Sequence, residues 1–201
     1  MNAIALRINC FALGLLTCSM FSCAKTSNPG GPQDSGFIFP LKTGNYWVSQ
    51  HETYDSLGTL RNAFVDTLRV VGDTMINSER WYYFLEGAHG FYTNRADGHY
   101  GYVAAWSPQP FLDLKYPAQQ GDTYSIPYAL GIREVVSTGA SITVPAGTFT
   151  CYQYRSPYPN NWQWNYYYTP GVGLILSSGV RRSQGGSILQ TSRMTLLQYF
   201  L

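Results

Sequence analysis

The side chains best suited to chemistry in this sequence are aromatic and amide groups gathered in one segment, residues 152–168. Eight of its seventeen residues are aromatic and none is acidic. Trp162 and Trp164 alternate with Gln163, so both indoles point to one side if the segment is a β-strand. The predicted ligand or partner surface consists of Tyr158, Asn160, Asn161, Trp162, Trp164 and Tyr166.

Three interpretations of this segment are open. Flat rings can stack on the apolar face of a sugar while amide groups bond its hydroxyls, which favours a glycan ligand. Tyrosine and tryptophan are equally enriched at the centres of protein–protein interfaces, which favours an envelope protein as partner. The third interpretation is structural: one face packs into a core and the other forms cross-strand aromatic pairs.

Motifs of catalysis and metal binding are missing from the sequence. His51, His89 and His99 lack the spacing of a zinc-binding helix, and there is no Cys-x-x-Cys pair. Neither a Gly-x-Ser-x-Gly elbow nor a phosphate-binding glycine loop is present. Cys151 has no histidine in the 50 residues before it, so we expect a buried thiol. The sequence thus predicts no catalytic residue, no metal and no cofactor, with a hydrolase built on a carboxylate pair as a remote alternative.

The charges are few and unevenly distributed. The net charge is only +2, which argues against a nucleic-acid partner. Glu134 is the last acidic residue, and four arginines follow it without a matching carboxylate: Arg155, Arg181, Arg182 and Arg193. They form either a mildly basic outer face or a seat for an anionic ligand or lipid headgroups.

Short apolar and aromatic runs separated by turn residues must position these groups. Residues 91–95 and 99–103 flank Asp97-Gly98, a dipeptide typical of tight hairpins. Residues 141–144 and 149–154 flank a second turn, and no amphipathic helix of ten residues is recognisable. We predict an all-β fold: one antiparallel domain of about ten strands in a strongly curved meander or half-barrel. A two-sheet sandwich is the alternative.

The first residues have the character of an export signal. Their apolar stretch, residues 8–16, is too short to span a membrane. Ser22-Cys23 is similar to the end of a bacterial lipobox, which implies cleavage after residue 22 and a lipid on Cys23. We therefore predict a signal peptide at 1–22, the lipidated Cys23 with a flexible tether at 23–36, and the β domain at 37–201. The lipid would attach the chain to a membrane.

Four motifs carry a family resemblance. They are FPL-x-x-G-N-x-W at 39–47, Tyr116-Pro117 with Gly121–Tyr124, VPAGTF at 144–149 and PGVGLI at 170–175. Together they resemble a group of Bacteroidota lipoproteins without an assigned activity. The resemblance implies an outer-membrane lipoprotein, and the lack of an acidic cluster after Cys23 favours the periplasmic side over the cell surface.

The strand pattern is also distantly similar to carriers that move lipoproteins through the periplasm, whose curved sheet encloses an apolar cavity. Those carriers close the cavity with helices, and this sequence has none that we recognise. The leading hypothesis is a non-catalytic, lipid-anchored envelope protein that binds a ligand or partner. A carrier or chaperone for lipid or acyl chains is the alternative, and a hydrolase the third.

Overall fold

A computed structural model describes residues 36–201 except 86–89, 104–106 and 128–130. The predicted signal peptide, Cys23 and nearly all of the tether lie outside the described residues, and so does His89. The secondary structure of the described part consists of β-strands alone. No described helix has the length and apolar character needed to cross a membrane.

Twelve strands alternate with short turns along the chain. They are β1 (Tyr46–Asp55), β2 (Leu60–Ile76), β3 (Glu79–Leu85), β4 (Phe91–Arg95), β5 (Gly98–Tyr102), β6 (Phe111–Lys115), β7 (Thr123–Ser125), β8 (Ile132–Val144), β9 (Gly147–Tyr158), β10 (Trp162–Thr169), β11 (Gly173–Arg182) and β12 (Ile188–Phe200). The predicted hairpins correspond to β4–β5 and β8–β9.

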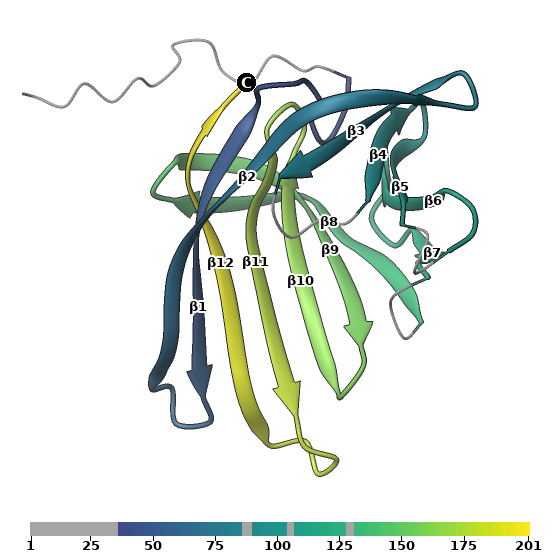
Figure 1. The fold of residues 1–201 in the computed structure, drawn as a ribbon. Helices are drawn as coiled ribbons and strands as arrows, with labels where there is room; N and C mark the ends of the chain where they lie inside the picture. The colour runs from purple at the N-terminus through teal and green to yellow at the C-terminus, as the bar shows by residue number, and fades with distance from the viewer. Residues whose placement is uncertain (1–35, 86–89, 104–106, 128–130) are drawn as a thin grey trace, which may run out of the picture. The chain divides into compact units, whose positions relative to one another are not determined.

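All twelve strands belong to one antiparallel sheet, in the order β6-β5-β4-β3-β2-β1-β12-β11-β10-β9-β8-β7. The first and last strands therefore pair in the middle of the sheet, where Tyr46 lies opposite Phe200 (Figure 1). The predicted curved, single antiparallel domain is confirmed, with twelve strands rather than about ten. The sandwich alternative is wrong for the described residues, because they form one sheet.

The two edge strands, β6 and β7, are linked by side chains. Tyr124 donates its hydroxyl hydrogen to the carbonyl of Asp113 over 3.0 Å, and Tyr154 donates to that of Lys115 over 2.8 Å. Arg133 also pairs with the Asp113 carboxylate, at 3.1 Å. Carbonyls of the β6 edge are thus satisfied by groups from β7 and β9, which blocks edge-to-edge association.

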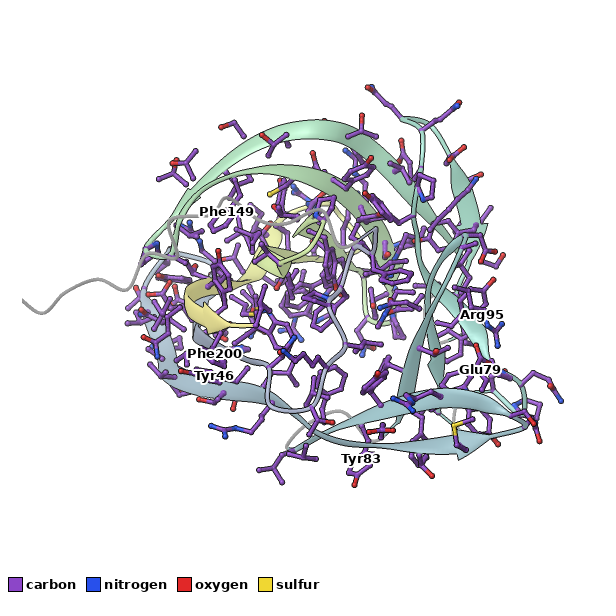
Figure 2. All side chains as sticks on the ribbon, turned by 90° about the horizontal axis from the view of Figure 1, so that it is seen from above. Tyr46, Glu79, Tyr83, Arg95, Phe149 and Phe200 are labelled. Atoms are coloured by element: carbon purple, nitrogen blue, oxygen red, sulfur yellow. The ribbon has the colours of Figure 1, made fainter. Side chains whose placement is uncertain are left out.

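The core lies on the inner face of the sheet, toward one end of the long strands. Figure 2 shows the strands curving around these side chains, with Phe149 inside the curve. Trp47 is 3% exposed and donates its indole N–H to the carbonyl of Val172 over 2.6 Å. Other members are Ile38, Phe39, Val70, Leu114, Val135, Val144, Cys151, Tyr154, Ile175 and Leu196. We call this part of the sheet the filled end.

Candidate functional site

The predicted aromatic segment forms β10, and its alternating residues share the inner face. The rings of Trp162 and Trp164 are nearly parallel, 5.5 Å apart and inclined by 23°. Trp164 and Tyr166 continue the series at 6.0 Å and 17°. Tyr166 donates its hydroxyl hydrogen to that of Tyr158, the last residue of β9, over 3.1 Å. We call Tyr158, Trp162, Trp164 and Tyr166 the aromatic tract.

A glycine on the neighbouring strand sets how Trp164 lies. Gly179 of β11 is directly opposite Trp164 in the register. A Cβ atom added to Gly179 would fall 2.6 Å from Cε2 and 2.7 Å from Cδ2 of the indole. The indole of Trp164 therefore lies against the Gly179 backbone, while its ring also stacks with those of Trp162 and Tyr166. Nothing in the sequence of β10 alone reveals this arrangement.

The remaining two predicted residues, Asn160 and Asn161, lie in the turn between β9 and β10. Their φ angles are 60° and 58°, a left-handed conformation that asparagine tolerates better than most residues. Both residues are exposed. Turn geometry therefore accounts for their residue type, and their position at the tip keeps the amides beside the aromatic tract.

A buried arginine holds the Tyr166 end of the aromatic tract in place. Arg133 is 3% exposed, and its guanidinium carbon lies 5.3 Å from the Tyr166 ring centre. Its Nε donates to the hydroxyl of Ser156 over 2.8 Å, and Asp113 balances its charge. Burial raises the pKa of Tyr158 and of Tyr166, so both phenols stay neutral at physiological pH.

Beyond β10, cross-strand pairing groups inner-face residues from six strands into rows. The first row borders the core at Tyr154 and joins β9 to β2 through Tyr154, Tyr166, Ser177, Met194, His51 and Phe64. The second contains Ser156, Trp164, Gly179, Ser192, Thr53 and Asn62. The third contains Tyr158, Trp162, Arg181, Gln190 and Asp55. These rows form the open end of the sheet, which points downward in Figure 1.

The rows combine aromatic walls with a floor of small polar residues. His51 and Phe64 stack at 4.7 Å and 4° on the side away from the aromatic tract. Gly179, Ser177 and Ser192 lie between the two walls. Burial lowers the pKa of His51, with Asp66 opposing the shift, so the imidazole favours its neutral form. The surface offers flat rings and hydroxyl groups at a spacing that several strands fix.

The groups that could support catalysis are dispersed. Among the described residues, no three His, Cys, Asp or Glu side chains come close enough to hold a metal ion. His99 is buried in the core against Tyr92 and bonded to Asn94, and burial lowers its pKa to about 4. Cys151 is buried as predicted, its thiol lies 3.3 Å from the Thr169 hydroxyl, and burial raises its pKa. Neither group faces the rows of the open end.

Comparison with known proteins finds several similar solved structures. No family model and no curated protein matches the chain. A protein of Bacteroides fragilis, described as a candidate exported protein with a YmcC-like fold, is 16% identical, with a TM-score of 0.40 over 82% of this chain and 99% of that one. A candidate lipoprotein of Parabacteroides distasonis is 18% identical, with a TM-score of 0.40 over 84% of this chain and 100% of that one.

Proposed function

We propose that the chain is a non-catalytic, lipid-anchored protein of the cell envelope that binds an oligosaccharide on the open end of its sheet. The observation that carries the proposal is the aromatic tract, a series of nearly parallel rings on the inner face in which Trp164 lies against Gly179. Stacking on aromatic rings covers the apolar side of a sugar ring. The neighbouring hydroxyl and amide groups can bond the sugar's hydroxyls.

The composition of the rows favours a sugar over an acyl chain. Met194 is the one aliphatic side chain in the three rows, while Ser192 and Thr53, both partly exposed, contribute hydroxyl groups. A lipid carrier needs an apolar lining, because unpaired polar groups disfavour contact with hydrocarbon. The rows are also not sealed: Phe64 is 51% exposed and Asn62 is exposed. A lipid-anchored protein could bind an oligosaccharide on such an open surface while it stays attached to the membrane.

Attachment to the membrane rests on the sequence alone. The lipobox-like Ser22-Cys23 and the polar spacer that follows it support an anchored domain that projects from the outer membrane into the periplasm. Multiple acyl chains on Cys23 would hold the protein there, since each buried methylene group adds about 0.8 kcal/mol. The charge of +2 makes nucleic acid an unsuitable partner.

The test uses the soluble segment 24–201, because residues 32–201 form a compact unit with its own core and all twelve strands. Binding to an array of neutral and acidic oligosaccharides is measured first, and hits are titrated by calorimetry. We expect Trp164→Ala and Trp162→Ala to weaken binding at least about tenfold, which corresponds to about 1.4 kcal/mol. Phe200→Ala, an exposed aromatic residue stacked on Tyr46, is the matched control.

Two outcomes would replace the proposal. A segment that binds no oligosaccharide but takes up a fluorescent fatty acid, with quenching of Trp162 and Trp164, would support the carrier alternative. Capture of a defined envelope protein, lost in the tryptophan variants, would support the protein-partner interpretation of the same surface.

A further inference from the structure

Arg181 differs from the other arginines late in the chain. Arg155 pairs with Glu134 at 3.6 Å, and Arg182 donates to the carbonyl of Gly186 over 2.9 Å. Arg193 lies opposite Glu52 in the β1–β12 register. In the described part of the chain Arg181 has no ion pair, and its Nε is buried without a hydrogen-bond partner. A buried donor left in this state costs stability unless something else accepts from it.

The position of Arg181 places this unsatisfied donor inside the proposed site. Arg181 pairs in the register with Trp162 on one side and with Gln190 on the other. Its guanidinium carbon lies 6.0 Å from the centre of the Trp162 ring. The residue therefore sits on the inner face, in the row that ends the aromatic tract.

The nearest carboxylate in that row is already engaged. Asp55, beyond Gln190, pairs with Arg61 at 2.6 Å and accepts hydrogen bonds from the backbone N–H groups of Leu57 and Thr59. The Thr59 bond is the largest cause that lowers the pKa of Asp55, so this carboxylate stays ionised and bound to its own turn. The charge of Arg181 thus has no carboxylate of this row to offset it.

We infer that the saccharide bound at the open end is acidic, and that Arg181 binds the carboxylate on its ring. A guanidinium presents Nε–H and Nη–H side by side, at the spacing of the two oxygens of a carboxylate. Because Nε of Arg181 is buried, the guanidinium must shift when the ligand binds so that this pair of donors faces it. A uronic acid seated on Trp162 and Trp164 would bring its carboxylate to this fork while its ring covers the indoles. The inference rests on the proposed function and names the ligand class for the same site.

The experiment compares two trisaccharides that differ only in charge: trigalacturonate and its carboxyl-reduced counterpart. They are titrated into the ¹⁵N-labelled segment 24–201, and the Arg181 Nε–H and tryptophan indole signals are followed by NMR. The Arg181 signal is assigned by its loss in Arg181→Gln. We expect trigalacturonate to shift both sets of signals and to bind at least about tenfold more tightly, because only its carboxylate can form a charge-assisted hydrogen bond with Arg181. Arg181→Gln should remove this preference, and Arg182→Gln, at the exposed neighbouring arginine that donates to the Gly186 carbonyl, should retain it.

The possible results separate the inference from the function on which it rests. If both trisaccharides shift the indole signals with equal affinity, the oligosaccharide site stands and the role of Arg181 is wrong. If neither shifts them, both the function and the inference fail. Sodium acetate provides the third arm: an acetate shift of the Arg181 signal as large as that caused by trigalacturonate, without indole shifts, would identify a general anion site and overturn the inference.

Discussion

The filled end and the open end of the sheet are built from the same strands but differ in what their inner faces carry. On β1, Trp47 is buried in the core, whereas His51 and Asp55 face the open rows. On β11, Ile175 is fully buried, whereas Gly179 and Arg181 lie opposite the tryptophans of the aromatic tract. Long strands thus let one end supply the hydrophobic stabilisation of both, which frees the other end to carry polar and aromatic groups.

The sharpest way to break this comparison is to truncate one aromatic residue at each end. Trp47→Ala removes a buried indole and its bond to Val172, and should lower the free energy of unfolding by about 3–5 kcal/mol. Phe64→Ala, at a half-exposed position of the open end, should cost less than about 1 kcal/mol. Urea unfolding followed by far-UV circular dichroism measures both changes. Equal losses would mean that the open end stabilises the fold as much as the core does.

The second prediction concerns how the stability of the filled end changes as the pH falls. His99, in the core, has its pKa lowered from 6.5 to about 4 by burial. Between these two values the unfolded chain binds a proton that the folded chain excludes, so stability falls as the pH drops through this range. The loss reaches about 3 kcal/mol by pH 4. Urea unfolding at pH 7, 6, 5 and 4 should show this slope, and His99→Asn should flatten it. A slope unchanged in His99→Asn would assign the acid sensitivity to other groups.

The third prediction tests how the open end is shaped. Gly179→Ala places a methyl group 2.6 Å from Cε2 of Trp164, so the indole must move. We expect a shift of the tryptophan fluorescence maximum, a loss of stability of about 1 kcal/mol and a large loss of oligosaccharide affinity. Gly139→Ala, where an added Cβ meets no atom within 4 Å, is the matched control. Retained affinity in Gly179→Ala would show that the ligand does not use the indole face that Gly179 sets.

The smallest effect separates turn formation from ligand contact at Asn160 and Asn161. Asn161→Gly keeps access to the left-handed conformation, so stability should change by only a few tenths of a kcal/mol. Asn160→Ala should cost about 1 kcal/mol, because alanine is strained at that φ. Thermal unfolding reports these changes. Calorimetry with the same oligosaccharide then shows whether either amide contributes to binding, and a tenfold loss in Asn161→Gly would assign it a direct contact.

Much of the fold could be predicted because its signals are local. The Asp97-Gly98 turn, the alternation of Ser141–Val144 and the lack of a helical period all act over a few residues. The three-residue strand β7 was too short to stand out from the surrounding turn residues. The pairing of β1 with β12 is equally invisible, since it joins residues at opposite ends of the chain.

The candidate site was predictable only in part, for a related reason. Alternation in β10 revealed that Trp162 and Trp164 share a face, but it could not show what lies beside them. Register shifts in β1–β12, between Val48 and Ser49, and in β10–β11, between Tyr167 and Tyr168, decide which residues face inward. This register places further residues in the site: Gly179, Arg181 and the His51–Phe64 pair. No local pattern in the sequence marks them.

The pairing of β1 with β12 also constrains how the protein can reach its folded state. Hairpins within β1–β6 or within β7–β12 can form from nearby residues, but strands of the two groups pair with each other only where Tyr46–Asp55 meets Gln190–Phe200. Such a non-local contact carries a large loop-closure entropy and slows folding. A chain that emerges N-terminus first, from a ribosome or a translocation channel, would keep the two halves of its sheet apart until its last strand is free.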